Sequence, residues 1–283
     1  MRTRKNAILL FSKVPQVGKV KTRLTTLKDG FLPPEYACAL YESMLFDVVE
    51  CCMDCAARME AASAGKEVEE QYDIIISSPG EQQRQMMEEL FAAKGPWPRE
   101  VTFISDAGAN FDEHYNSSFE QAWERGCETI LSMGCDMPAL THDVLEMGFR
   151  HLHELCEIEG GGVVLSPDQE MGVSIVGWTS NTRFDHTGVF YCQSGLTVLP
   201  AYIEKCRALG LPARYIPAMP DVDTWPDLRH NITLVQAIEY AAQFQDDLTV
   251  PRRTLATLEE YGFVDVRVAP NDLMDPRDEI DHT

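Results

Sequence analysis

The sequence predicts an α/β protein, a three-layer αβα sandwich around a mostly parallel mixed sheet. Short apolar runs alternate with longer amphipathic stretches through residues 1–245. The short runs are apolar almost throughout, which is typical of parallel strands that helices cover on both faces. With 45% hydrophobic residues in a chain of 283, the core can be large. We expect one domain over residues 1–245 and a C-terminal extension over residues 246–283.

Each expected strand is a short run rich in β-branched and other apolar residues. The expected strands cover residues 7–12, 72–77, 100–104, 128–133, 162–166, 173–178 and 213–217. Apolar residues at three- and four-residue spacing predict helices over residues 34–59, 80–93, 111–126, 141–157, 194–209 and 224–244. Thr141 and Ser194 stand where side chains cap the helices that follow. In the extension we expect one more helix and a strand at residues 263–268.

Charge is distributed unevenly along the chain. The first 28 residues hold eight Lys or Arg and no acid, whereas the whole protein has a formal charge of -21. The local excess of base predicts an anionic ligand near the N-terminus. Distant acids do not oppose it strongly, because the screening length in physiological salt is only about 8 Å. The acidic remainder argues against a DNA or RNA backbone as partner.

Other features of the sequence bear on the location of the protein and on the state of its cysteines. No run approaches the ~20 apolar residues of a membrane span, and the apolar run after the basic start is too short for a signal peptide, so we expect a cytoplasmic protein. Nine cysteines, an odd number, favour reduced thiols over a disulfide framework. Cys51, Cys52 and Cys55 cluster in the 34–59 helix, where packing is favoured over a metal site because a second ligand pair at zinc-like spacing is missing.

Histidines contribute little to the expected chemistry. His114 and His142 are expected on helix surfaces. His186 lies in an expected loop that could border an acceptor, but a plain surface position is favoured.

The loop after the first strand is the strongest candidate for a ligand site. In an open parallel sheet, ligands bind beyond the carboxyl ends of the strands. This loop, residues 12–24, carries Lys13, Lys19, Lys21 and Arg23 between turn-forming Gly and Pro residues. Three ammonium groups and one guanidinium fork suit a diphosphate, and a solvated basic loop is the alternative.

Carboxylates follow two further strands. Asp136 comes after the fourth strand and can hold Mg²⁺ or Mn²⁺ if phosphate oxygens complete the coordination; capping a helix is the alternative. Asp221 and Asp223 follow the last strand and point the same way if the segment is extended, which offers a second carboxylate to the cation. Capping of the next helix by Asp223 or Thr224 is the alternative.

Together these three segments resemble a bacterial glycosyltransferase-like family of unknown function in the nucleotide-diphospho-sugar transferase (GT-A) superfamily. Residues 11–24 match the pattern F-[AS]-K-x-P-x-x-G-x-V-K-T-R-L, residues 134–140 are similar to G-S-D-x-P-x-L, and residues 221–228 are close to D-V-D-T-x-x-D-L. The resemblance covers roughly residues 5–235 and implies a GT-A-like domain over residues 1–245.

The resemblance also implies roles for particular residues. It makes Lys13, Gly18, Lys21 and Arg23 the nucleotide and phosphate-binding residues, and it makes Asp136 and Asp223 the ligands of Mg²⁺ or Mn²⁺. The chain departs from the family where D-G-G-Y-Y is usual, since residues 170–174 read E-M-G-V-S. Glu170 is the one candidate there for a catalytic carboxylate. The usual Asp-x-Asp signature is reduced to Asp136 alone.

The function that follows is metal-dependent transfer of a sugar from a nucleotide diphosphate sugar to an unknown small-molecule acceptor. A nucleotidyltransferase that joins a nucleoside triphosphate to a phosphorylated small molecule is one alternative. A nucleotide-sugar-binding protein that has lost catalysis is another. The apolar face of the 224–244 helix fits either a homodimer interface or the C-terminal tail.

Overall fold

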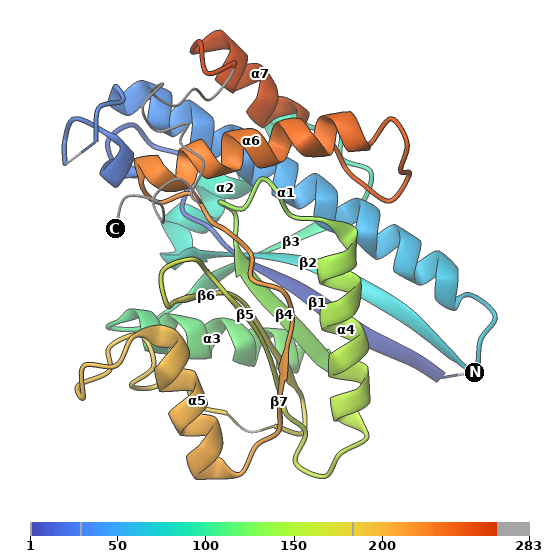
Figure 1. Ribbon diagram of the computed structural model, residues 1–283. Helices are drawn as coiled ribbons and strands as arrows, with labels where there is room; N and C mark the ends of the chain where they lie inside the picture. The colour runs from blue at the N-terminus through green and yellow to red at the C-terminus, as the bar shows by residue number, and fades with distance from the viewer. Residues whose placement is uncertain (1, 29, 183, 265–283) are drawn as a thin grey trace, which may run out of the picture.

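The computed structural model describes residues 2–28, 30–182 and 184–264. A central sheet is covered by helices on both faces, so the expected fold class is confirmed (Figure 1). The strands are β1 (Arg2–Phe11), β2 (Val68–Pro79), β3 (Val101–Asp106), β4 (Thr129–Gly134), β5 (Val163–Pro167), β6 (Val173–Thr179) and β7 (Ala213–Tyr215). The helices are η1 (Thr22–Leu24, a 3₁₀ helix), α1 (Pro34–Ser63), α2 (Gly80–Lys94), α3 (Phe111–Glu124), α4 (His142–Cys156), α5 (Val198–Leu209), α6 (Trp225–Ala241) and α7 (Arg252–Glu260). The seven strands expected before residue 245 and all the expected helices are confirmed.

The strands form one sheet in the order β3-β2-β1-β4-β6-β5-β7. β6 runs antiparallel to its neighbours β4 and β5, and the other paired strands are parallel. In the sheet register, Phe11 at the end of β1 lies beside Ser77 of β2 and Gly134 of β4. The carboxyl ends of the central strands therefore meet at one edge, where the loops after β1 and β4 are adjacent.

The alternation of side chains along β1 divides the core between the two faces of the sheet. Ile8 and Leu10 pack in a cluster with buried residues of α1, α2 and α4. Ala7 and Leu9 pack in a second cluster with α3 and α5. All four side chains are fully buried, which explains why the second half of this strand is a continuous apolar run.

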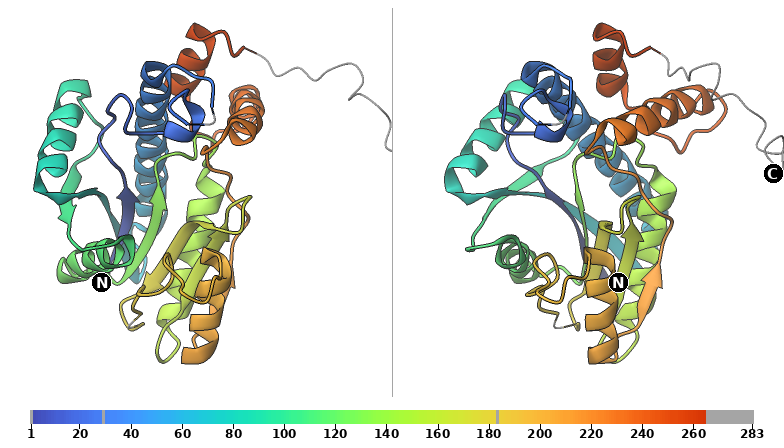
Figure 2. Two further views of the ribbon diagram at one scale, coloured as in Figure 1. Left: turned by 90° about the vertical axis from the view of Figure 1, so that its left-hand side faces the viewer. Right: turned by 60° about the vertical axis from the view of Figure 1, so that its left-hand side comes forward.

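A third cluster connects the basic loop to the C-terminal helices. Leu24 of η1 packs with the first half of α1, with Ile232 of α6 and with Leu258 of α7. Figure 2 shows α6 and α7 beside the amino-terminal part of α1. The apolar face of α6 thus contacts a helix of the expected C-terminal extension. The domain boundary at residue 245 stays a prediction, and most of the strand expected at residues 263–268 lies outside the described residues.

Capping residues set the beginnings of the helices. Thr224 is the N-cap of α6 in a capping box, where its backbone N–H donates to Asp227 Oδ2 over 2.6 Å. Thr141 is at the N-cap position of α4, as expected, but its side chain makes no capping hydrogen bond. The cap expected at Ser194 is wrong, because α5 begins at Val198 after the N-cap Thr197. A turn closed by a hydrogen bond from the Gly195 N–H to the Cys192 carbonyl precedes it.

Two of the histidines expected at the surface are buried. His142 is covered by the segment between α6 and α7, where its Nε2 is 2.9 Å from Thr249 Oγ1. His186 packs among aromatic rings and accepts from the Trp178 indole N–H at 3.2 Å; burial lowers its pKa to about 3. Both expectations of a surface position are wrong, because groups distant in the sequence cover the two rings: Thr249 packs on His142, and rings of α3, β6 and α5 surround His186. Cys51, Cys52 and Cys55 are buried core residues of α1, as the packing interpretation expected.

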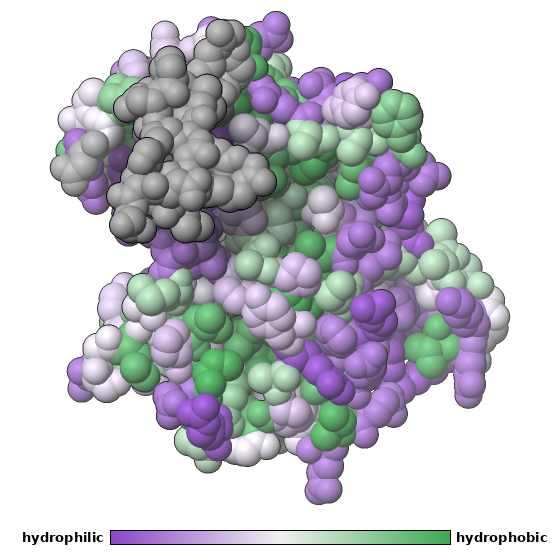
Figure 3. Space-filling view, viewed as in Figure 1, coloured by the Kyte–Doolittle hydropathy of each residue, from purple (hydrophilic) through white to green (hydrophobic). Residues whose placement is uncertain are grey.

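Hydrophilic and apolar side chains are interspersed on the face shown in Figure 3. None of the helices in the described ranges is both long enough and apolar enough to cross a membrane.

Candidate functional site

A cavity of about 710 Å³ opens at the carboxyl edge of the parallel strands. Charged residues line one part of it, which we call the charged side: Lys13, Lys19, Lys21, Arg23, Asp136, Asp221 and Asp223. Aromatic rings and one acid–imidazole pair line another part, which we call the aromatic side: Phe11, Asp106, Phe111, His114, Tyr115, Phe190 and Tyr191. The two sets come from loops that are far apart in sequence and that the sheet topology brings together.

The basic loop bends so that its cations face the cavity. Gly18 has a φ of +73°, a backbone conformation that favours glycine. Lys21 also lies in the left-handed region, with a φ of 45°, and η1 begins directly after it. This conformation costs a residue with a side chain about 1–2 kcal/mol. The interactions of the Lys21 side chain offset that cost, as described next.

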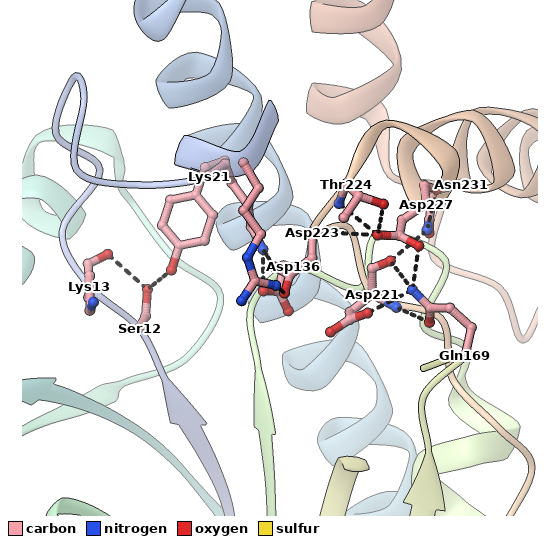
Figure 4. Close-up of polar contacts among 12 residues, drawn as sticks. Ser12, Lys13, Lys21, Asp136, Gln169, Asp221, Asp223, Thr224, Asp227 and Asn231 are labelled. Carbon is pink, nitrogen blue, oxygen red and sulfur yellow. Dashed lines mark hydrogen bonds and ion pairs between the residues drawn. The ribbon is translucent and has the colours of Figure 1, made fainter. Parts of the chain in front are cut away.

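Lys21 lies between two carboxylates (Figure 4). Its ammonium group donates to Asp136 Oδ2 over 2.6 Å and to Asp223 Oδ1 over 2.9 Å. Only 6% of its side chain is exposed. Burial by itself would lower the pKa of Lys21, but the two carboxylates more than offset this effect and hold the pKa above its ordinary value. The lysine is therefore a fixed positive charge between the segments that follow β4 and β7.

Asp223 has cations on both of its carboxylate oxygens. Lys21 contacts Oδ1, and the Arg23 guanidinium donates to Oδ2 over 2.8 Å. Burial would raise the pKa of Asp223, but these two positive charges hold it below its ordinary value. Asp223 thus stays ionised and positions Lys21 and Arg23 on the charged side.

Close backbone packing places Asp136. A Cβ atom at Gly134 would lie 2.8 Å from Asp136 Oδ1, so a side chain there would push the carboxylate out of place. The Asp136 carbonyl accepts from the Val222 N–H at 3.0 Å, which ties the loop after β4 to the segment before α6. Glycine at residue 134 therefore leaves room for the Asp136 carboxylate.

Asp221 has a different environment from Asp223. The Gln169 amide donates to its Oδ1 over 2.9 Å, and no Lys or Arg among the described residues pairs with it. Burial and the nearby charges of Asp136 and Asp223 raise the pKa of Asp221 to about 7. Two carboxyl groups only two residues apart thus differ in charge state near neutral pH.

Lys13 and Lys19 make no ion pair with any residue in the described ranges, and both line the cavity. Beneath them, the hydroxyls of Ser12 and Tyr41 are hydrogen bonded at 2.8 Å. The charged side therefore offers two unpaired ammonium groups beside the Lys21 and Arg23 cations. Such a group of donors fits a di- or triphosphate.

The carboxylates also provide oxygen ligands of the kind that Mg²⁺ and Mn²⁺ prefer. In the described part of the chain, no three His, Cys, Asp or Glu side chains gather as a complete protein metal site. Asp136 keeps Oδ1 unpaired by any base, whereas both oxygens of Asp223 contact cations. The donor set fits a cation held by Asp136 together with ligand oxygens, and it fits Asp223 less well.

The structure brings most of the expected site residues together. Lys13, Lys21, Arg23, Asp136 and Asp223 all line the cavity, and Gly18 lies in the loop without lining it. Glu170 is exposed and lies outside the lining residues; its backbone N–H donates to Asp168 Oδ1 over 2.6 Å. A catalytic role for Glu170 stays a prediction.

Sequence reasoning missed the aromatic side. His114 was expected on a helix surface, but it lines the cavity, where its Nδ1 is 2.5 Å from Asp106 Oδ1. Asp106 ends β3, and His114 lies in the first turn of α3. The available signal was position, since Asp106 directly follows an expected strand, as Asp136 does.

The chain shares sequence with a bacterial family over its middle part. Residues 60–193 match the family described as "Uncharacterized protein conserved in bacteria (DUF2064)". The expected family resemblance is confirmed. The DUF2064 match includes Asp136 and Glu170, whereas the basic loop and Asp223 lie outside it.

A solved structure shows the same fold. A "putative nucleotide-diphospho-sugar transferase" from Desulfovibrio desulfuricans G20 has a TM-score of 0.65 and 22% identity, with 90% of this chain and 97% of that chain covered. At this identity the likeness shows the fold alone, and it confirms the expected nucleotide-diphospho-sugar transferase-like architecture. No curated protein matches the chain.

Two further structures are more distant. A cytidylyltransferase from Leptospira borgpetersenii serovar Hardjo-bovis (strain JB197) has a TM-score of 0.46 and 12% identity, with 95% of this chain and 99% of that chain covered. The manganese complex of Rv0371c from Mycobacterium tuberculosis H37Rv has a TM-score of 0.38 and 17% identity, with 82% and 98% covered. Neither likeness is close enough to add to the argument.

Proposed function

We propose that the protein is a transferase that uses a nucleotide-activated donor, and that its reaction is glycosyl transfer from a nucleotide diphosphate sugar. One observation carries the proposal: four cations of a single loop and the carboxylate Asp136 line one cavity at the carboxyl edge of the sheet. This edge is where open α/β sheets bind ligands. A diphosphate matches the charge and the donor geometry of the charged side.

In the proposed reaction the bond between the sugar C1 and the diphosphate oxygen breaks. Negative charge then develops on the departing diphosphate, while a hydroxyl oxygen of the acceptor forms the new bond to C1 and its proton passes to water. Lys13, Lys19, Lys21 and Arg23 bind the diphosphate and offset that charge. Fixed positive groups of this kind stabilise a transition state more than the ground state, because the charge they face grows during the reaction.

A Mg²⁺ or Mn²⁺ ion is the proposed cofactor, held by Asp136 and by oxygens of the donor phosphates. When bound, such an ion adds positive charge at the leaving group. Asp223 positions Lys21 and Arg23, since both of its oxygens contact these side chains. Glu170 lies outside the lining residues, so the proposal gives it no step.

The identity of the leaving group tests the reaction type. The purified protein is incubated with Mn²⁺ and each of a panel of nucleotide diphosphate sugars, or nucleoside triphosphates with sugar phosphates, and the nucleotides are separated by ion-exchange chromatography. With no acceptor added, water takes the place of the acceptor; we expect slow hydrolysis that releases a nucleoside diphosphate from one of the sugars, and loss of that release in the Lys21→Ala/Arg23→Ala variant.

Other outcomes separate the alternatives. Pyrophosphate released from a triphosphate would show nucleotidyl transfer in place of glycosyl transfer. Nucleotide binding without any released product would show a binding protein. Lys28→Ala serves as the control, because Lys28 is exposed in the same basic segment but does not line the cavity.

A further inference from the structure

The aromatic side of the cavity contains one pair of polar side chains that the proposed reaction does not use. Asp106 is the last residue of β3, and His114 follows one turn into α3. Both line the same cavity as Lys21 and Arg23. β3 and β4 are three strands apart in the sheet, so Asp106 and Asp136 lie roughly 14 Å from each other at a strand spacing of about 4.8 Å. A ligand bound at the charged side therefore has its far end near this pair.

Asp106 is held as a buried hydrogen-bond acceptor. Only 3% of its side chain is exposed, and the Ser77 hydroxyl donates to Oδ2 over 2.7 Å. Its other oxygen, Oδ1, lies 2.5 Å from His114 Nδ1. Ser77 is itself hydrogen bonded to Ser118 of α3 at 2.8 Å. Both carboxylate oxygens thus have donors, and the group is fixed between β2, β3 and α3.

The contact with Asp106 decides what His114 offers to the cavity. A carboxylate accepts hydrogen bonds, so we assign the proton of the neutral ring to Nδ1. Nε2 then carries a lone pair and is an acceptor. It has no hydrogen-bond partner within the described ranges, and 27% of the side chain is exposed. In its neutral form, His114 is therefore an oriented, accessible acceptor.

The rings around this acceptor suit an uncharged, flat or sugar-like group. Phe11 and Tyr115 are stacked with their centroids 4.3 Å apart, and Phe111 meets Phe190 edge to face at 4.6 Å. Five of the seven residues of the aromatic side are Phe or Tyr. The aromatic side therefore suits the nucleoside part of a nucleotide, whereas the charged side suits its phosphates.

We propose that His114 binds the nucleoside part of the donor, accepting a hydrogen bond at Nε2 from a base N–H or a ribose hydroxyl, with Asp106 as its positioning residue. This inference rests on the proposed function, since it needs a nucleotide bound with its phosphates at the charged side. It makes His114 a specificity-determining residue, because a nucleotide that presents no donor at this position leaves Nε2 desolvated and unpaired.

Comparing two ligands isolates the nucleoside contact. Binding of inorganic pyrophosphate and of uridine, cytidine, adenosine and guanosine diphosphates is measured by calorimetry for wild type, His114→Phe and His114→Gln. We expect His114→Phe to weaken the preferred nucleoside diphosphate about fivefold to tenfold, as loss of one hydrogen bond does, and to leave pyrophosphate unchanged. His114→Gln keeps a side-chain acceptor and should recover part of the loss. His151→Phe on α4 is the control and should bind both ligands as wild type does.

Each failure has a distinct pattern. If no nucleoside diphosphate binds wild type, whether or not pyrophosphate binds, both the proposed function and the inference are overturned. If a nucleoside diphosphate binds wild type and His114→Phe equally, the inference alone is overturned. An equal weakening of pyrophosphate would also overturn it, since the effect would then come through the phosphate site.

A measurement on wild type covers the case in which the variants fold poorly. In protein labelled with ¹⁵N-histidine, the Nε2 resonance of His114 should shift when the nucleoside diphosphate binds and should stay in place with pyrophosphate. The same shift with both ligands, or with neither, would contradict the proposal.

Discussion

The two sides of the cavity differ in how the chain builds them. The cations of the charged side come from one continuous segment, residues 13–23, and face carboxylates from only two other loops. The aromatic side collects residues from β1, β3, α3 and the segment after β6. A site built from one segment is visible in the sequence, whereas a site built by packing of distant segments becomes visible only in the fold.

The largest expected effect breaks the charged side and spares the aromatic side. Replacing Lys21 and Arg23 by alanine removes two of the four cations and leaves Asp136 and Asp223 facing each other without a base between them. We expect the affinity for a nucleoside diphosphate and for pyrophosphate to fall more than 100-fold by calorimetry, since charge-assisted hydrogen bonds to phosphate are among the strong ones. Circular dichroism should show an unchanged fold. Affinity within twofold of wild type would show that Lys21 and Arg23 do not bind the phosphates.

We expect a smaller effect from replacing Asp136, which distinguishes the role of this carboxylate from the role of the cations. Asp136→Asn keeps the shape of the side chain but removes the negative charge that we propose holds the metal. Nucleotide affinity with Mn²⁺ should fall roughly tenfold to the value that wild type shows with a chelator, because the ion loses its one protein carboxylate. Asp143→Asn, in the first turn of α4, is the matched control. If wild type and Asp136→Asn gain equally from Mn²⁺, Asp136 is not a ligand.

A third prediction concerns stability and pH at Asp221. Its pKa in the folded protein is about 7, against an ordinary value of 3.8, so between these values the folded state binds one more proton than the unfolded state. Stability from this group is therefore present at low pH and is lost as pH rises to about 7. Asp221→Asn removes the effect, and we expect it to be more stable than wild type by about 1–3 kcal/mol at pH 8, with the two converging near pH 4.

Urea denaturation of both proteins from pH 4 to pH 8 checks this, because the titration of groups that do not interact with Asp221 cancels in the difference. A difference that stays constant with pH would mean that Asp221 titrates normally.

The smallest expected effect lies beneath the charged side. Tyr41→Phe removes the buried hydrogen bond with the Ser12 hydroxyl, so the free energy of unfolding should fall by about 1 kcal/mol. Urea denaturation measures this loss. Tyr191→Phe is the control, since its side chain is exposed on the rim of the cavity. Equal stability of Tyr41→Phe and wild type would show that the Ser12 contact contributes nothing.

The sequence predicts the fold well because the strands and helices carry their own periodic patterns. Residues 7–11 of β1 form an unbroken apolar run, and the structure buries residues 7–10 and most of β4 on both faces of the sheet. The sequence also predicts the loop after β1 well, because the cations of this loop lie close together in the chain. His186 was misjudged for the opposite reason, because its burial depends on Trp178 and other rings that reach it from several elements. Local periodicity carries no information about such contacts.

The pairing of Lys21 with Asp136 and Asp223 shows the same limit within the charged side. The residues were named from the sequence, but their roles depend on distances between loops that are 115 and 202 residues apart. Only those distances show that Asp223 faces two cations while Asp221 faces none. Residue type and order predict which groups meet, and the fold decides what each of them does.

The most direct test of the charged side is a thermal-shift panel. Wild-type protein is heated with nucleoside diphosphates, triphosphates and nucleotide sugars, each with and without Mn²⁺. Ligand at 100 times its dissociation constant stabilises the folded state by about 2.7 kcal/mol, which raises the melting temperature by about 5 °C or more. We expect such a rise for one nucleoside diphosphate or its sugar, and we expect the rise to be larger with Mn²⁺ than without. A folded protein that none of these nucleotides stabilises would contradict it.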